Sequence, residues 1–254
     1  MSVTVSARGL SHSYGSLDVL SGIELEIEAG EILALVGASG CGKSTLLELL
    51  GGLREPDSGV VEVAGRSDGP GRLANCAWMP QRDCLLPWYS ALDNAALALL
   101  NQGQSKSEAR RAAERKFEHF GLAGFEDARP GELSGGMRQR VAFIRTLISG
   151  KPVLLLDEPL AALDAITRAE LQEWLAPTLS EAGATVLMVT HDVEEAIYLA
   201  DRVAVLSPRP GHIVTTIEGA RHAPGTRAEV VSSPDFNRSR EELLGLLRSG
   251  GGSR

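Results

Sequence analysis

The hydrophobic and polar positions of this chain follow two different periods. Short apolar runs bounded by glycine or polar residues are typical of strands, and apolar residues spaced three or four positions apart are typical of amphipathic helices. The pattern predicts strands at residues 3–7, 23–27, 32–36, 60–63, 76–79, 153–156, 185–189, 203–206 and 213–217, and helices at residues 43–50, 165–181 and 193–200. Strands that alternate with helices in this way predict an α/β fold.

The alternation is interrupted once and stops before the C-terminus. Residues 91–120 have the pattern of helices, with a polar break at residues 101–107 and a charged amphipathic stretch at residues 108–120. This predicts a helical subdomain inserted at about residues 85–150. After Gly219 the sequence turns polar, and this extension at residues 220–254 contains a short amphipathic helical segment at 240–248 and a tail at 249–254 that we expect to be frayed.

Composition excludes several classes of protein. With 254 residues, of which 43% are hydrophobic and 23% charged, the chain can bury a large core. No apolar run approaches the roughly 20 residues of a spanning helix, and the first ten residues lack the blocks of a signal peptide, so we expect a cytoplasmic protein. A formal net charge of -8 argues against nucleic acid as a general partner. The three cysteines have neither disulfide-framework nor zinc-site spacing.

One glycine-rich segment fits the pattern GxxxxGK[ST] of a phosphate-binding loop. It follows the apolar run at residues 31–36 and consists of Gly37, Ala38, Ser39, Gly40, Cys41, Gly42, Lys43, Ser44 and Thr45. Small residues let successive backbone N–H groups converge on phosphate oxygens, and the helix that follows adds its positive dipole end. We expect Lys43 to reach the β- and γ-phosphates of a nucleotide and the Ser44 hydroxyl to ligate Mg²⁺.

Two adjacent carboxylates follow another apolar run. The run at residues 153–156 ends in Asp157 and Glu158, at the carboxyl end of a predicted strand, which is the edge where α/β sheets bind ligands. Asp157 is therefore predicted to hold the Mg²⁺ shell. Glu158 is predicted to orient or deprotonate the water that attacks the γ-phosphate.

A third motif points to one family. The segment Leu133-Ser134-Gly135-Gly136-Met137 resembles the LSGGQ signature of ABC-type ATPases, which phosphate-loop kinases, GTPases and helicases lack. Ser134 is a good N-cap, so the helix terminus at Gly135 and Gly136 offers a second anion site. The family geometry implies that this site meets ATP held by another subunit, in a head-to-tail homodimer with two ATP molecules sandwiched between the subunits.

The resemblance covers the chain up to about Gly219 and implies further site residues. Tyr14 matches the aromatic residue that stacks on adenine. Gln81 matches the glutamine that contacts Mg²⁺ and the lytic water, Asp164 matches the D-loop that crosses the dimer interface, and His191 matches the switch histidine that binds the γ-phosphate. The family fold is a phosphate-loop NTPase core with an N-terminal antiparallel β region and an inserted helical subdomain. Residues 1–219 are thus identified as an ABC ATPase domain.

Three positions depart from the common family pattern. Met137 stands where the signature often has glutamine, Leu160 replaces the frequent phenylalanine after Asp-Glu-Pro, and Ala162 replaces the usual D-loop serine. None of the three removes a phosphate or metal ligand. The missing serine hydroxyl removes one hydrogen bond expected at the dimer interface, so coupling between the two ATP sites is expected to differ.

Two segments are similar to one group of ABC importers. The segment Cys84-Leu85-Leu86-Pro87-Trp88 resembles the LLPW of the nitrate, sulfonate, taurine and thiamine-precursor importers, and residues 206–211 resemble their VLSPRPG. This resemblance implies docking on an integral membrane permease at the inner face of the cell membrane, with an extracytoplasmic solute-binding protein acting indirectly. The transported solute stays open.

Two other functions fit parts of the same pattern. A cytosolic ABC ATPase that moves no solute, such as one serving iron–sulfur assembly, would have a similar size. The chain has no second cassette, coiled-coil insertion or zinc cysteines, which DNA-repair or translation ATPases would favour. A phosphate-loop kinase would lack the Ser-Gly-Gly signature. A permease that co-purifies with the chain would separate the importer from the soluble alternatives.

Overall fold

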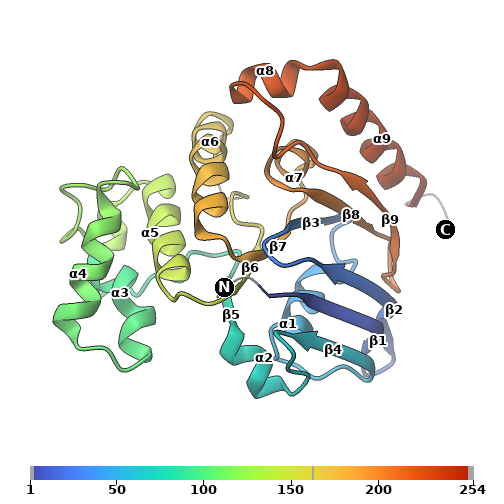
Figure 1. Ribbon diagram of the computed structural model, residues 1–254, viewed down its shortest axis with the longest axis horizontal. Coiled ribbons are helices and arrows are strands. Elements are labelled where there is room, and N and C mark those ends of the chain that lie inside the picture. Colours follow the sequence, from blue (N-terminus) through green and yellow to red (C-terminus); the bar gives the residue numbers. More distant parts are fainter. Residues whose placement is uncertain (1–2, 162, 251–254) are drawn as a thin grey trace.

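The computed structural model describes residues 3–161 and 163–250, which form two β-sheets flanked by helices (Figure 1). The smaller sheet has the strand order β2-β1-β4 and is antiparallel. Its strands are β1 (Val5–Tyr14), β2 (Leu17–Ile27) and β4 (Ser58–Val63). β1 and β2 are much longer than the predicted runs at 3–7 and 23–27 because Gly15, at a φ of 61°, lets the chain turn tightly between them.

The larger sheet has the strand order β5-β6-β7-β3-β8-β9. Its strands are β3 (Ile32–Gly37), β5 (Cys76–Met79), β6 (Val153–Asp157), β7 (Thr185–Val189), β8 (Arg202–Leu206) and β9 (Ile213–Glu218). All neighbouring pairs are parallel except β8 and β9. The α/β fold class and the antiparallel N-terminal region predicted from the sequence are therefore confirmed. Consecutive parallel strands place their carboxyl ends, and the loops that follow them, along one edge.

The central strand β3 separates two hydrophobic cores. Ile32, Ala34 and Val36 pack in one core with the helices α5 (Gly135–Leu147), α6 (Ala165–Ala182) and α7 (Val193–Leu199). Leu33 and Leu35 pack in the other core with α1 (Lys43–Leu50) and the antiparallel sheet. All six residues of β3 are buried, which agrees with its uninterrupted apolar run. A strand held on both faces is a rigid base for the loop that leaves its carboxyl end.

Helices surround the sheets, and three of them are set apart. Around the larger sheet lie α1 (Lys43–Leu50), α2 (Gly69–Asn75), α6 (Ala165–Ala182) and α7 (Val193–Leu199). To one side lie α3 (Ala91–Asn101), α4 (Lys106–Phe117) and α5 (Gly135–Leu147), with a 3-10 turn at Pro130–Glu132 (Figure 1). The sequence analysis did not predict α2, because its glycines and proline are weak helix formers.

The C-terminal segment forms two helices that pack against the core. They are α8 (Arg227–Ser232) and α9 (Pro234–Gly250), which contact α7 (Figure 1). Val230, Phe236 and Leu243 are buried in the same core as α7. The sequence predicted only the amphipathic part of α9 at residues 240–248. Of the tail expected to be frayed, residues 249–250 continue α9 and residues 251–254 lie outside the described residues. The domain boundary at residue 219 stays a prediction.

Candidate nucleotide site

The glycine-rich loop runs from the end of β3 to the start of α1, as its sequence predicted. Gly42 precedes α1 with a φ of 111°, and a Cβ there would lie 2.7 Å from the Leu20 side chain. A Cβ on Gly37 would lie 2.8 Å from both the Cys41 sulfur and the Leu206 carbonyl. Glycine is therefore required at both positions, by conformation at one and by close packing at both.

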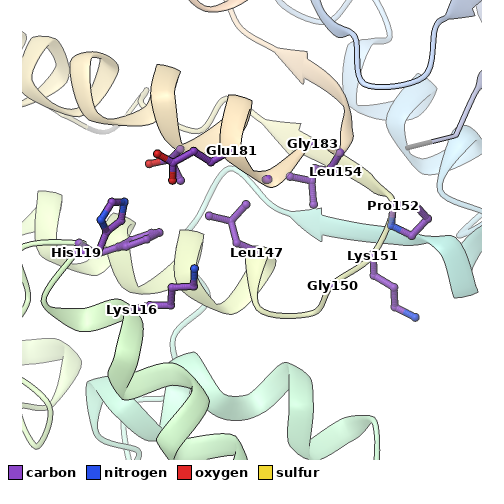
Figure 2. Close-up of a pocket in the computed structure, with 13 residues that line it drawn as sticks. Lys116, His119, Leu147, Gly150, Lys151, Pro152, Leu154, Glu181 and Gly183 are labelled. Carbon is purple, nitrogen blue, oxygen red and sulfur yellow. The ribbon is translucent and has the colours of Figure 1, made fainter. Parts of the chain in front are cut away.

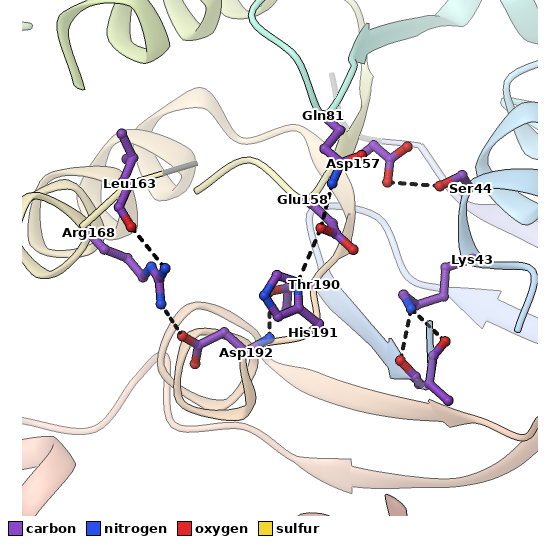
Figure 3. A network of polar contacts seen from close by, with 12 residues as sticks. Lys43, Ser44, Gln81, Asp157, Glu158, Leu163, Arg168, Thr190, His191 and Asp192 are labelled. Atoms are coloured by element: carbon purple, nitrogen blue, oxygen red, sulfur yellow. Dashed lines mark hydrogen bonds and ion pairs between the residues drawn. The ribbon is translucent and has the colours of Figure 1, made fainter. Parts of the chain in front are cut away.

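Lys43 is nearly buried beneath this loop. Its ammonium group donates hydrogen bonds to the carbonyls of Gly37 at 2.8 Å and Ala38 at 3.1 Å (Figure 3). These contacts hold a cation at the centre of a loop of backbone N–H groups. The chain thus concentrates positive charge where a phosphate group would bind.

Asp157 and Ser44 face each other across the end of β6. The Ser44 hydroxyl donates a hydrogen bond to an Asp157 carboxylate oxygen at 3.2 Å (Figure 3). Burial raises the pKa of Asp157, and the Ser44 hydrogen bond partly opposes that shift. A hydroxyl and a buried carboxylate are hard oxygen ligands, which Mg²⁺ prefers, and a bound cation would stabilise the carboxylate that burial disfavours.

Glu158 is held by residues from two other segments. One of its carboxylate oxygens accepts a hydrogen bond from the Gln81 amide at 2.9 Å and lies 3.1 Å from Nδ1 of His191 (Figure 3). Gln81 follows β5 and His191 follows β7, so three strand ends converge on one oxygen. Glu158 has a φ of 47°, unusual for a residue with a side chain, and its N–H donates to the Val189 carbonyl at 2.8 Å.

Lys43, Ser44, Gln81 and Glu158 line a pocket of about 350 Å³, whereas Asp157 and His191 are not among the residues of its wall. Of the predicted site residues, the structure places in its wall Tyr14, Ser39, Gly40, Gly42, Lys43, Ser44, Thr45, Gln81 and Glu158. Tyr14 is 41% exposed, and its ring is nearly perpendicular to the His12 ring at a centroid distance of 5.0 Å. The Arg54 guanidinium carbon lies 5.1 Å from the centroid of the Tyr14 ring. Three further wall residues were not predicted as site residues: Leu17, Val19 and Arg209.

The signature segment lies outside this pocket. Ser134 caps α5, and its hydroxyl accepts a hydrogen bond from the Met137 N–H at 3.2 Å. A Cβ on Gly136 would lie 2.8 Å from the Thr167 side chain, so the signature packs closely on the first turn of α6. Gly135 lines a separate hollow with Arg138 and Leu163. Within one chain, the two predicted anion sites are therefore distinct.

Arg168 joins two of the predicted loops. It lies in the first turn of α6, which Asp164 caps by accepting from the Ile166 and Thr167 N–H groups, both at 3.1 Å. The Arg168 guanidinium donates to the Leu163 carbonyl at 3.0 Å and to the Asp192 carboxylate at 2.9 Å (Figure 3). Backbone and hydroxyl hydrogen bonds lower the pKa of Asp164. Ala162, the third departure from the family pattern, lies outside the described residues.

Comparison with known proteins decides the family. The model of the ABC transporter family matches residues 20–161, more than half of the chain. The chain belongs to the ABC transporter family. It is therefore an ATP-hydrolysing cassette, as the sequence predicted.

Several ABC relatives are similar along most of the chain. A taurine import ATP-binding protein, TauB of Chromobacterium violaceum, is 43% identical over 89% of this chain and 87% of the relative. A nitrate import ATP-binding protein, NrtD of Synechocystis, is 42% identical over 92% of this chain and 90% of the relative. The bicarbonate transport protein CmpC of Synechocystis is also 42% identical over 92% of this chain, which spans 35% of that relative.

A solved structure supports the cassette fold. A dimeric ATP-binding cassette bound to ADP and phosphate, described as a post-hydrolysis state, is 29% identical with a TM-score of 0.74. The match covers 84% of this chain and 98% of that chain. The predicted roles of single residues in our ABC ATPase stay predictions, although the structure brings most of them together.

Another hollow of the ABC ATPase lies at the opposite edge of the sheet. It has a volume of about 300 Å³ and lies where α4, the end of α6 and the start of β6 approach one another (Figure 2). Lys116, Lys151 and Glu181 contribute its charged groups, and His119 adds an imidazole. None of the predicted phosphate or metal ligands is among its lining residues. Among the residues that the structure describes, no group of three or more histidine, cysteine or acidic side chains could hold a metal.

Proposed function

We propose that this chain is the ATP-hydrolysing subunit of an ABC importer. Its solute would be a small molecule of the nitrate, sulfonate, taurine or thiamine-precursor type. Support comes from relatives named as taurine and nitrate import proteins and from the two sequence segments similar to that importer group. Among the described residues, no helix is long and apolar enough to cross a membrane. Transport would therefore require a permease that spans the membrane.

ATP hydrolysis would use the groups around Glu158. Its carboxylate, held between Gln81 and His191, would orient and deprotonate a water molecule that attacks the γ-phosphate. Lys43 and the loop N–H groups would bind the β- and γ-phosphates, and Tyr14 would stack on adenine. Ser44, Asp157 and Gln81 would hold Mg²⁺, which neutralises phosphate charge when bound.

The position of the signature supports a homodimer. Ser134 and Gly135 lie outside the pocket that contains Lys43. A second copy, placed head to tail, would bring its own signature to the γ-phosphate and enclose two ATP molecules. Closing this dimer on ATP and opening it after hydrolysis would provide the movement that a permease follows. The solved dimeric cassette is consistent with this arrangement.

One exposed loop supports the importer proposal, because it presents an aromatic residue to a partner. Trp88 is 66% exposed, in the segment that connects Gln81 to α3. The buried Asn94 side chain fixes this loop: its oxygen accepts from the Leu86 N–H at 2.7 Å, and its amide donates to the Leu86 and Tyr89 carbonyls. Leu85 points into the core instead. A large exposed aromatic residue on a fixed loop is suited to anchor a partner.

We further propose that a permease helix docks on Leu86, Pro87 and Trp88 at the cytoplasmic face of the membrane, where ATP is available. An extracytoplasmic solute-binding protein would deliver the solute to that permease. The loop follows Gln81 directly, and Arg138 of α5 binds Asp83 at 3.1 Å. Docking at Trp88 would thus be close to both the pocket and the signature helix.

Substitution of Trp88 tests the importer function. Because Trp88 is exposed, Trp88→Ala should leave folding and basal ATPase activity unchanged. It should weaken association with the permease by roughly tenfold or more, since aromatic anchors contribute about 2 kcal/mol or more at interfaces. Co-purification with the permease and solute uptake measure this. Phe125→Ala, another exposed aromatic residue in the insertion, is a matched control. Normal uptake by Trp88→Ala would contradict the proposal.

A further inference from the structure

The turn between β8 and β9 lies beside the phosphate loop. Leu206, at the end of β8, pairs in register with Gly37, the first residue of the loop. Farther along the turn, the Gly211 N–H donates to the Val19 carbonyl at 2.8 Å, and the Ser21 N–H donates to the Gly211 carbonyl at 3.0 Å. A Cβ on Gly211 would lie 2.6 Å from the Cys41 carbonyl. The turn is therefore hydrogen-bonded to β2 and packs closely against the phosphate loop.

The Ser207 hydroxyl forms hydrogen bonds with other polar groups of this turn. Its hydroxyl oxygen accepts from the His212 N–H at 3.0 Å and lies 2.9 Å from Nδ1 of the same residue. The Ser207 hydroxyl also contacts the carbonyls of Pro208 at 2.9 Å and Pro210 at 3.3 Å. With its ends and interior held, the turn fixes the backbone of Arg209, whose side chain is exposed.

The Arg209 side chain extends over the phosphate loop. Its Nη2 lies 3.6 Å from the point where a Cβ on Gly40 would be, and Arg209 lines the nucleotide pocket. The acidic residue of the described wall, Glu158, contacts Gln81 and His191. Lys43 and Arg209 are the two cationic residues in the described part of the pocket wall. Lys43 already donates to two carbonyls under the loop. No hydrogen bond or ion pair in the described part of the chain engages the Arg209 guanidinium.

We propose that Arg209 is a further ATP-binding residue, whose guanidinium pairs with the phosphate chain of the nucleotide. A guanidinium forms strong, often bidentate hydrogen bonds with phosphate oxygens, and an unpaired one loses no existing partner when it does so. Gly40, which carries no side chain, leaves the space between Arg209 and the loop open. The inference rests on the proposed nucleotide site. It adds to that site a residue from the turn that follows β8.

Binding of three nucleotides tests this assignment. Affinities for ATP, ADP and AMP are measured by titration calorimetry with three proteins that all carry Glu158→Gln, which prevents turnover. One retains Arg209, and the other two carry Arg209→Gln or Arg209→Lys. Arg115→Gln, an exposed arginine on α4, is the matched control. Arg209→Gln should weaken ATP and ADP about tenfold and AMP less than twofold, and it should reduce the salt dependence of ATP binding. Arg209→Lys should recover part of the affinity.

Three results would overturn the assignment. The first is unchanged ATP and ADP affinity in Arg209→Gln. The second is an equal loss for all three nucleotides, which would place Arg209 at the adenosine. The third is unchanged nucleotide affinity with loss of the ATP-dependent dimer on size-exclusion chromatography, which would make Arg209 a contact of the second copy. Lys43→Ala distinguishes a failure of the Arg209 assignment from a failure of the proposed nucleotide site. If Lys43→Ala also binds ATP normally, the proposed nucleotide site itself is wrong.

Discussion

Glu158 shows at the scale of one residue how this chain concentrates its chemistry. Its backbone lies in the left-handed region, and its N–H is bonded to the neighbouring strand β7. Such a conformation costs of order 1–3 kcal/mol and persists where the surroundings fix it. Here it directs the carboxylate to Gln81 and His191 instead of along the strand direction.

Glu158→Gln should therefore stop hydrolysis without preventing binding. The amide keeps the size and hydrogen bonding of the side chain but removes the charge that activates water, so we expect a fall in kcat of roughly 10²–10⁴-fold. Lys43, Ser44 and Asp157 remain to bind ATP and Mg²⁺. Single-turnover hydrolysis and nucleotide titration measure the two effects. Wild-type turnover in this variant would remove Glu158 as the base and favour His191 or the substrate itself.

Glu195 is a second carboxyl with an unusual environment. It is buried beside Asp192 and Thr190 on α7, and one of its oxygens has no hydrogen-bond partner among the described residues. Burial, and then the charge of Asp192, raise its pKa to about 8, although Arg168 opposes the shift. Between the ordinary carboxyl pKa and about 8, the folded state binds a proton that the unfolded state releases.

The contribution of Glu195 to the stability of the wild-type chain should consequently fall as the pH rises from about 5 to 8. The slope that Glu195 contributes is at most about 1.4 kcal/mol per pH unit. Glu195→Gln carries a neutral amide throughout and should lack this contribution, so its stability relative to wild type should improve over the same interval. Urea unfolding at several pH values measures the difference. Parallel curves for the two proteins would show that Glu195 is ionised in the folded state.

The sequence predicted some residues of the candidate site and did not indicate others, for a physical reason. Lys43, Ser44 and Asp157 stand in contiguous motifs whose spacing determines their chemistry, and the structure brings them together. Arg209 lies in a turn whose relation to the phosphate loop depends on the pairing of β8 with β3, distant in sequence. Only the rule that parallel strands end at a common edge could have indicated it.

At the scale of elements, α6 and α7 begin at the two loops that carry Asp164 and His191. Asp164 caps α6, and Asp192 caps α7 directly after His191. Arg168 connects them, because its guanidinium binds both the Leu163 carbonyl and Asp192. The C-terminal helices support the same pair: Arg227 binds Gln172 of α6 at 2.8 Å, and Arg240 binds Glu194 of α7 at 2.8 Å.

Arg168→Gln should separate binding from hydrolysis. Without the guanidinium, the Asp164 loop and the His191 loop lose their shared partner, so kcat should fall roughly tenfold if one charged hydrogen bond positions His191. The affinity for ATP should stay within about twofold, since Arg168 does not line the pocket. Steady-state kinetics give both values, with Arg115→Gln as control. An unchanged kcat, or a parallel loss of affinity, would contradict a positioning role.

Elements were predicted best where an apolar run was continuous and clearly bounded. The buried strands β3, β6 and β7 match their predicted runs to within one residue. Helices α2 and α8 are each no longer than seven residues, and β1 and β2 extend far beyond their apolar runs. In those cases capping groups or strand pairing, instead of local periodicity, determine the structure.

At the scale of the whole molecule, the two predicted anion sites of the described chain line different hollows. Lys43 lines the nucleotide pocket, and Gly135 lines a second hollow, which shares Gln81 with the first. If two copies combine head to tail, each ATP is enclosed by the phosphate loop of one copy and the signature of the other. Variants in the two halves should then complement each other.

Mixing Lys43→Ala with Gly135→Asp tests this directly. Each homodimer lacks one half of both sites and should be inactive. A heterodimer contains one doubly impaired site and one intact site, so an equal mixture should recover up to about a quarter of the wild-type activity if the sites act independently. Gly135 is not in the left-handed region, and a Cβ there would contact Leu163 at 3.6 Å, so aspartate fits while its charge repels the partner's γ-phosphate.

The control for this mixture is Gly131→Asp, which adds the same charge at an open position before α5. It should remain active alone. Gly135→Asp should still bind ATP by itself, because the phosphate loop of its own chain is intact, whereas Lys43→Ala should not. ATPase activity is measured as the ratio of the two variants is varied at constant total protein, and recovery should be greatest at equal amounts. A mixture without activity, in a preparation whose variants do associate, would exclude the composite site and require both anion sites to act within one copy.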